Sequence, residues 1–184
     1  MKKNVENLTQ DYVKSLFDYN KDNGYLYWKT PKVSWVTVGD RAGSYHKGTR
    51  YRRLKINNNS YLEHRIIWLY VYGYYPEYDI DHINRIRDDN RLSNLREVSR
   101  SCNIKNSIIR IDNKSGITGI HYNKIKKTFK VQIVDNNNKR LNLGRYKNFN
   151  DAVVVRWKAE VKYRYPDCNT TSTAYNYLKK KGLL

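Results

Sequence analysis

Residues 78–106, which read YDIDHINRIRDDNRLSNLREVSRSCNIKN, constrain this chain more than any other stretch. They contain an adjacent Asp81 and His82, an Asn94 that follows a polar loop, and an Asn103 nine residues later. A carboxylate and an amide oxygen are ligands that one hard divalent cation accepts, and an adjacent imidazole can take a proton from water. The stretch therefore supplies the groups of a metal-assisted hydrolytic centre: carboxylate and amide oxygens as possible ligands and a histidine as a possible base.

The same residues predict a strand–loop–strand–helix unit. The pattern favours a strand over 79–83, a polar loop over 84–93, a returning strand over 95–98 and a helix that Ser99 caps. Adjacent side chains of a regular strand point to opposite faces. Asp81 and His82 can therefore converge only where the first strand ends or twists.

A longer segment, EHRIIWLYVYGYYPEYDIDHINRIRDDNRLSNLREVSRSCNIKN, carries a His-Arg helix, a Gly-x-x-Pro turn, Asp-His, Asp-Asn-Arg, Asn-Leu-Arg and a closing Asn-x-x-Asn in this order. This ordered set resembles phage and intron-encoded HNH endonucleases of the ββα-metal fold, in the variant whose last ligand is Asn. The resemblance covers residues 8–108 and is tightest over 63–106. It implies a homing-type enzyme that hydrolyses double-stranded DNA with one Mg²⁺ or Mn²⁺ per active site.

The resemblance also implies roles for single residues. Asp81 and Asn103 bind the metal ion, and His82 acts as general base while a backbone carbonyl holds its other ring nitrogen. Asn94 hydrogen-bonds across the loop to fix the backbone that carries His82. His64 supports the metal motif or contacts phosphate, with a plain core histidine as the alternative. Asn106 either supports the ligand Asn103 or contacts phosphate, and a surface position on the helix is as plausible.

The net charge of +19 indicates a polyanionic partner, and its distribution is uneven. Residues 1–60 carry 12 Lys and Arg against 5 Asp and Glu, residues 61–108 balance at 7 each, and residues 109–184 carry 17 against 5. Basic flanks around a neutral centre suit a catalytic module that its neighbours hold on DNA. The arginines that we consider for DNA contact in this half are Arg50, Arg52 and Arg53, on an exposed strand face or at phosphate, and Arg85, Arg87 and Arg91, which Asp88 and Asp89 could instead pair locally.

The segment before the centre predicts a helix, a hairpin and further short strands. Leu8, Tyr12, Leu16 and Tyr19 recur at helical spacing behind a Thr9 cap, so we expect a helix over 8–19. An Asp-Asn-Gly turn within 18–29 indicates the hairpin, and residues 39–56 alternate as strands do. Residues 61–72 predict a second helix that Gly73 ends.

Beyond the NKSG of residues 113–116, a second fold unit is predicted. Three β-rich runs at 117–123, 128–135 and 139–143 precede a helix that starts at an Asn150 cap and ends before Pro166. GITGIHYNKIKKTFKVQIVDNNNKRLNLGRYKNFNDAVVVRWKAEVKY resembles an AP2-type DNA-binding domain, in which the sheet enters the major groove. The residues that this resemblance makes candidates for DNA contact are His121, Lys124, Lys126, Lys127, Lys130, Gln132, Arg140 and Arg145.

Two cysteines, Cys102 and Cys168, lie far apart without a second Cys or His at ligand spacing. We therefore expect no disulfide framework and no structural zinc, with Cys102 as a buried thiol in a reducing interior. No stretch is long and apolar enough for a membrane span, and no signal-peptide pattern follows Met1. The expected compartment is intracellular, in the cytoplasm of a bacterial host.

The sequence thus predicts an α+β protein: an N-terminal helix and β-rich extension over 1–60, an HNH core over 61–112, an AP2-like domain over 113–168 and a basic tail, helical or disordered, over 169–184. We expect a monomer or weak dimer that nicks or cuts double-stranded DNA. One rival function is a DNA-binding protein with an inactive HNH centre. An RNA-directed protein is another, although nothing in the chain resembles an RNA-recognition module.

Overall fold

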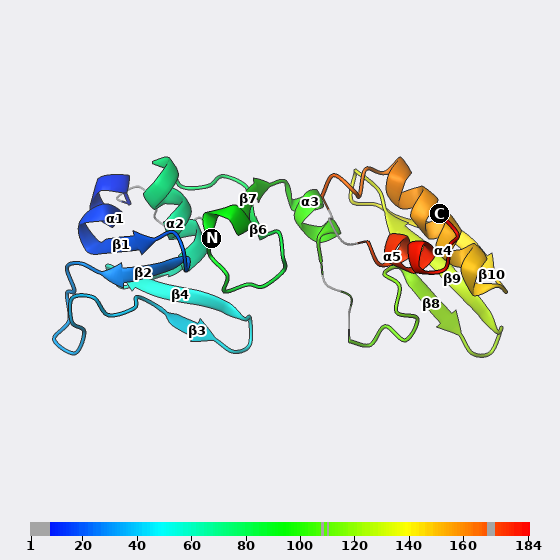
Figure 1. Cartoon of the computed structure of the whole chain (residues 1–184), viewed down its shortest axis with the longest axis horizontal. Helices are drawn as coiled ribbons and strands as arrows, with labels where there is room; N and C mark the ends of the chain where they lie inside the picture. The colour runs from blue at the N-terminus through cyan, green and yellow to red at the C-terminus, as the bar shows by residue number, and fades with distance from the viewer. Residues whose placement is uncertain (1–7, 108, 110, 169–171) are drawn as a thin grey trace. The chain divides into compact units, whose positions relative to one another are not determined.

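The computed structural model describes residues 8–107, 109, 111–168 and 172–184, which divide between two compact units, residues 1–99 and 100–184. Both are mixtures of short helices and small antiparallel sheets, so the fold is of the predicted α+β kind (Figure 1). The first unit contains, in chain order, α1 (Gln10–Leu16), β1 (Phe17–Asn20), β2 (Tyr25–Trp28), β3 (Ser44–His46), β4 (Tyr51–Ile56), β5 (Asn59–Leu62), α2 (Glu63–Tyr72), β6 (Asp79–His82), the 3₁₀ turn η1 (Leu92–Asn94) and β7 (Leu95–Val98).

The first helix is shorter than its apolar spacing predicts. The Thr9 side chain caps α1 by accepting a hydrogen bond from the Tyr12 N–H at 3.2 Å, as expected. The helix then ends at Leu16, because Phe17 is extended and pairs with Trp28 in the β1–β2 hairpin. The prediction of a helix to residue 19 is wrong, since the strand ladder competes successfully for these residues.

Helix α2 lies in the middle of the first unit, packed against α1 and against β4 and β5. Its apolar side chains, including Ile66, Ile67 and Leu69, are almost fully buried. It ends at Gly73, whose φ of 81° is the left-handed conformation that glycine adopts without strain. The sheet beside it has the order β3-β4-β5, and the separate β6–β7 pair follows in the chain.

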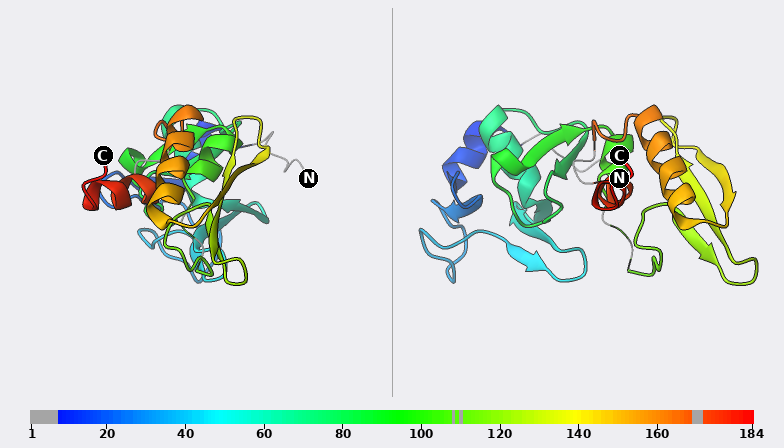
Figure 2. Two further views of the ribbon diagram at one scale, coloured as in Figure 1. Left: turned by 90° about the vertical axis from the view of Figure 1, so that its right-hand side faces the viewer. Right: turned by 45° about the vertical axis from the view of Figure 1, so that its right-hand side comes forward.

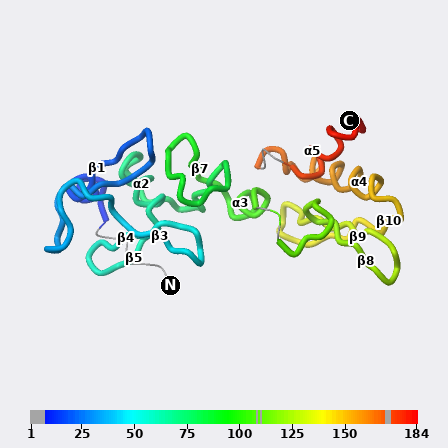
Figure 3. Tube along the Cα trace, turned by 60° about the horizontal axis from the view of Figure 1, so that its bottom comes forward, coloured from blue at the N-terminus to red at the C-terminus, as the bar shows by residue number. Residues whose placement is uncertain are grey.

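The second unit is one sheet covered by helices. It contains α3 (Arg100–Lys105), β8 (Ile120–Asn123), β9 (Thr128–Val134), β10 (Arg140–Tyr146), α4 (Phe149–Lys162) and α5 (Thr173–Lys180). The sheet order is β10-β9-β8, α4 lies across one face and α5 packs beside α4 (Figures 2 and 3). The cap of α4 is Asn148 rather than Asn150, because the Asn148 side chain accepts hydrogen bonds from the Asn150 and Asp151 N–H groups. Within the predicted tail, residues 169–171 lie outside the described residues, and the rest contains a short helix with Lys179 and Lys180 in its last turn.

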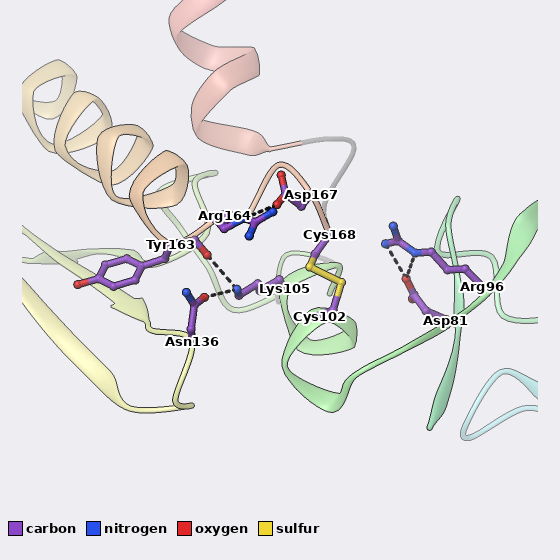
Figure 4. Close-up of a disulfide and its surroundings, with 9 residues drawn as sticks. All are labelled: Asp81, Arg96, Cys102, Lys105, Asn136, Tyr163, Arg164, Asp167 and Cys168. Carbon is purple, nitrogen blue, oxygen red and sulfur yellow. Dashed lines mark hydrogen bonds and ion pairs between the residues drawn. A yellow bond between two sulfur atoms is a disulfide. The ribbon is translucent and has the colours of Figure 1, made fainter. Parts of the chain in front are cut away.

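A disulfide joins Cys102 of α3 to Cys168 beyond α4, with the two Cα atoms 5.2 Å apart (Figure 4). The expectation that Cys102 is a packing thiol is therefore wrong. Sequence spacing could not show the pairing, because the two cysteines are separated by 66 residues. Nearby, Lys105 Nζ donates to Asn136 Oδ1 at 2.7 Å and to the Tyr163 carbonyl at 2.9 Å. These bonds hold α3 to the β9–β10 turn and to the end of α4 within the second unit.

None of the helices in the described part of the chain is both long and apolar enough to cross a bilayer.

Candidate active site

The β6–β7 pair places the Asp-His dipeptide at the end of its first strand. In the antiparallel register, His82 lies opposite Leu95 and Asp81 opposite Arg96. Asn94 closes the intervening loop: its Oδ1 accepts from the Asn84 N–H at 2.9 Å, and its Nδ2 donates to the Asp89 carbonyl at 2.8 Å. Since Asn94 is buried, these two bonds fix the backbone immediately after His82.

His82 is a buried imidazole, 3% exposed, held by a side-chain amide. Its Nε2 lies 3.0 Å from Asn90 Oδ1, where the family resemblance led us to expect a backbone carbonyl. Burial lowers the pKa of His82, while the hydrogen bond to Asn90 and the Asp81 carboxylate oppose that shift. The ring is therefore neutral at neutral pH, which is the form a general base needs.

Behind Asn90 stands a buried carboxylate. Asn90 Nδ2 donates to Glu63 Oε2 at 3.0 Å, and Arg52 Nε lies 3.0 Å from the same oxygen. Asn90 and Glu63 are both fully buried. Burial raises the pKa of Glu63, while the guanidinium groups of Arg52 and Arg41 oppose that shift. Arg52 was a candidate for DNA contact, but its side chain is 11% exposed and belongs to this internal network.

His64 packs directly on His82. The two rings stand nearly perpendicular with centroids 5.0 Å apart, and the Tyr51 ring lies 5.3 Å from His64 and 5.8 Å from His82. Burial lowers the pKa of His64 well below its usual range, and the nearby His82 and Arg65 add to that shift. His64 is 4% exposed and its ring packs against His82, so its role as a support or a phosphate contact stays a prediction.

Asp81 already has a cationic partner within the first unit. Its Oδ2 accepts from Arg96 Nε at 3.0 Å and from Arg96 Nη2 at 2.9 Å. The oxygen donors of Asp81 and Asn103 are of the type that Mg²⁺ or Mn²⁺ accepts, so the donor chemistry fits a hard cation. Across the residues that the structure describes, His, Cys, Asp and Glu form no cluster of three or more that could hold a metal ion.

The other two asparagines of the motif belong to the second unit. Asn103 is half-buried in α3 and Asn106 is buried just after the helix. Asp81 lies in the first unit, so the pairing of Asp81 and Asn103 at one metal ion stays a prediction, as does the supporting role of Asn106.

The loop arginines have different surroundings. Arg91 pairs with Asp89 through two hydrogen bonds of 2.8 Å and 2.6 Å, which is the local pairing that we left open. Arg87 donates to the Thr49 carbonyl at 3.0 Å and lies over the Tyr51 ring. Arg85 occupies a turn with a φ of 66°. Arg50 is an exposed turn residue, and Arg53 is half-buried in β4.

The candidates in the second unit divide by position. Ile120, Phe129 and Val131 belong to the core that faces α4, so the alternating residues of the same strands form the open face of the sheet. The register aligns His121, Lys130 and Arg145 in one row across the three strands. Gln132 and Arg140 alternate onto the same face. The exposed β8–β9 turn carries the remaining candidates, Lys124, Lys126 and Lys127.

Sequence reasoning missed Asn90 and Glu63 as parts of this site. Asn90 is the middle residue of the Asp-Asn-Arg element and Glu63 begins the His-Arg helix, so both lay within quoted motifs. Their roles depend on a hydrogen bond that spans 27 residues, which no local pattern reveals.

Residues 61–104, which run from β5 into α3, match a family model described as HNH endonuclease. No curated protein and no solved structure matches the chain. The family match supports an HNH nuclease domain that acts on DNA.

Proposed function

We propose that this chain is a metal-dependent, site-specific DNA endonuclease of the homing type. The observation that carries the proposal is the buried, neutral His82 beside Asp81, held by Asn90 on a loop that Asn94 closes, within the segment that matches HNH endonucleases. A general base that fixed hydrogen bonds hold in place suits water activation for phosphodiester hydrolysis.

Each residue has one task in this mechanism. His82 takes the proton of the attacking water, Asn94 keeps the His82 backbone in place, and His64 packs against the ring. Asp81 and Asn103 would hold the ion. A bound Mg²⁺ or Mn²⁺ supplies charge stabilisation at the scissile phosphate and the departing oxygen.

The second unit would select the site. The open sheet face carries a cross-strand row of His121, Lys130 and Arg145. Like charges directly opposite one another destabilise a sheet unless a counter-charge is present, so this row suits the DNA backbone. A polar Gln132 on the same face suits contact with base edges, as the AP2-like resemblance implies.

The test is cleavage of supercoiled plasmid from a library of the source genome, with Mg²⁺ or Mn²⁺. Relaxed or linear product that disappears in EDTA and in His82→Ala would support a metal-dependent nuclease with His82 as base. Cleavage that survives His82→Ala would remove this mechanism. The ratio of nicked to linear product would separate single-strand from double-strand cutting.

The alternative is a DNA-binding protein with an inactive HNH centre, and the Arg96–Asp81 ion pair favours it, because a guanidinium occupies the carboxylate expected to bind metal. Mn²⁺ binding separates the two functions. An inactive centre predicts no Mn²⁺ affinity that depends on Asp81, together with tight, salt-dependent DNA binding and no cleavage.

A further inference from the structure

A continuous series of buried polar side chains runs away from His82. His82 Nε2 contacts Asn90 Oδ1, Asn90 Nδ2 contacts Glu63 Oε2, and Arg52 Nε lies beside the same carboxylate oxygen, each step at 3.0 Å. The series crosses three parts of the first unit: the loop after β6, the start of α2, and β4. Each hydrogen bond in this series needs one donor and one acceptor, so the chemistry of one member determines which atom the next member must present.

The carboxylate sets that direction. The guanidinium groups of Arg52 and Arg41 favour the ionised form of Glu63, and an ionised carboxylate can only accept hydrogen bonds, so Asn90 presents its NH₂ group to Oε2. The amide oxygen then faces His82, and an oxygen cannot donate. Nε2 of a neutral His82 must therefore carry the proton, which leaves the ring lone pair on Nδ1.

The backbone of Asn90 is fixed as well. The Tyr19 hydroxyl of β1 donates to the Asn90 carbonyl at 3.1 Å. In the β1–β2 turn, Gly24 has a φ of 76°, and a Cβ built there would lie 2.6 Å from the Asn90 carbonyl carbon and 2.4 Å from the Arg91 nitrogen. The N-terminal hairpin therefore packs its glycine directly on the peptide that presents the Asn90 side chain.

We propose that Asn90 is the positioning residue of His82, and that Glu63, Arg52 and the β1–β2 hairpin together hold it in the orientation that makes Nε2 the protonated nitrogen. Asn90 would touch neither water nor DNA and would act only through the His82 ring. Nδ1 is then the atom that receives the proton from water, a consequence that rests on the proposed nuclease function. The tautomer assignment does not depend on that function.

The direct measurement is long-range ¹H–¹⁵N NMR of the histidine side chains in the full chain, without DNA or metal, at a pH where the rings are neutral. His82→Ala identifies the His82 signals. We expect the Nε2–H tautomer in the wild type and its loss in Asn90→Leu, which keeps a similar volume but has no acceptor. Asn59→Leu, at an exposed asparagine of the same unit, serves as the matched control and should leave the pattern unchanged. An Nδ1–H tautomer in the wild type, or an Nε2–H tautomer that persists in Asn90→Leu, would overturn the proposal.

A charge-swapped pair covers the case in which Asn90→Leu does not fold. Asn90→Asp alone puts two carboxylates in contact in a buried site and should perturb both fold and tautomer. In Asn90→Asp with Glu63→Gln, the new amide at position 63 presents its NH₂ group to the new carboxylate at position 90 and its oxygen to the Arg52 guanidinium, and that carboxylate still accepts from Nε2–H of His82. We expect this double variant to recover the wild-type tautomer. A folded double variant that shows the Nδ1–H tautomer would contradict the positioning role.

Cleavage assays then separate positioning from the proposed function. Asn90→Leu should lower kcat roughly 10²-fold or more while DNA affinity stays unchanged, because a misoriented base affects chemistry rather than binding. Recovery of kcat in the double variant supports the role, and an Asn90→Leu that cuts normally would remove it. A wild type with the Nε2–H tautomer but no cleavage would refute the nuclease and leave the positioning of His82 standing.

Discussion

At the scale of the residue, two buried imidazoles make the first unit sensitive to acid. Burial lowers the pKa of both His64 and His82, so the unfolded chain takes up protons near the ordinary pKa of about 6.5 before the folded chain does. Stability is therefore complete above pH 6.5 and falls as pH decreases below it, by up to about 1.4 kcal/mol per pH unit for each proton.

His64→Phe tests this linkage, because phenylalanine keeps a flat ring against His82 but binds no proton. The loss of unfolding free energy between pH 7 and pH 5 should be smaller in the variant by roughly 1–2 kcal/mol. Urea titrations monitored on first-unit NMR signals would measure it, with the exposed His46→Gln as control. An unchanged pH dependence would mean that His64 does not resist protonation.

The Arg96–Asp81 pair predicts a competition with metal. Arg96→Gln removes the guanidinium from Asp81 Oδ2, and we expect the Kd for Mn²⁺ to fall roughly 3- to 10-fold, since such partly exposed pairs contribute about 1 kcal/mol. Calorimetric titration of Mn²⁺ would measure it, and Arg91→Gln, which frees Asp89 instead, is the matched control. Weaker Mn²⁺ binding in Arg96→Gln would show that the arginine orients Asp81 for the ion.

Single residues of the candidate site could be located from the sequence only where a local motif defined them. Asp81, His82 and Asn94 follow from spacing and the family pattern, and the structure places Asp81 and His82 in β6 and Asn94 in η1, directly before β7. Asn90 and Glu63 do not, because an amide becomes a positioning group only when folding brings a distant carboxylate behind it. Arg52 was misplaced for the same reason: a basic residue in a strand looks like a surface contact until its buried partner is known.

At the scale of the element, the β1–β2 hairpin should matter for catalysis although it lies far in sequence from His82. Gly24→Ala meets both a positive φ and the 90–91 peptide, whereas Gly39→Ala meets a positive φ of 88° with nothing within 4 Å. Gly39→Ala should therefore cost about 1 kcal/mol of stability, and Gly24→Ala substantially more. Thermal unfolding would measure the difference. Only Gly24→Ala should also shift the His82 NMR signals. Equal effects of the two variants on stability and on these signals would mean that the hairpin does not support the Asn90 peptide.

The disulfide should stabilise the second unit. A link across 66 residues restricts the unfolded chain, for an expected contribution of about 3–4 kcal/mol. Cys102→Ser with Cys168→Ser should lower the urea midpoint of this unit, and dithiothreitol should lower that of the wild type to the same value. If dithiothreitol does not change the urea midpoint of the wild type, the disulfide adds no stability to this unit.

Element types were predictable from periodicity, and element ends were not. The predicted returning strand over 95–98 matches β7, because its residues alternate between apolar and polar and turn residues bound them on both sides. The end of α1 and the cap of α4 were missed, because Phe17–Tyr19 fits a helix face as well as a strand, and Asn148 and Asn150 are chemically equal caps. The pairing of Phe17 with Trp28 decides where α1 ends, and the hydrogen bonds of the Asn148 side chain decide which residue caps α4.

At the scale of the whole molecule, the net charge of +19 predicts strongly salt-dependent DNA binding. The phosphate contacts could come from the open face of the sheet or from the exposed side of α4. Lys130 and Arg145 lie side by side on the open face of the sheet, while Lys158 and Lys162 lie exposed on α4.

Lys130→Ala with Arg145→Ala should reduce the slope of log K against log salt by about 2, because two phosphate contacts and their counterions are lost. Lys158→Ala with Lys162→Ala removes the same charge from the helix and should leave the slope nearly unchanged. Fluorescence anisotropy over a salt series would measure both slopes. Equal reductions of the slope in both double variants would mean that DNA affinity depends on total charge alone. The sheet would then not be the DNA-recognition surface.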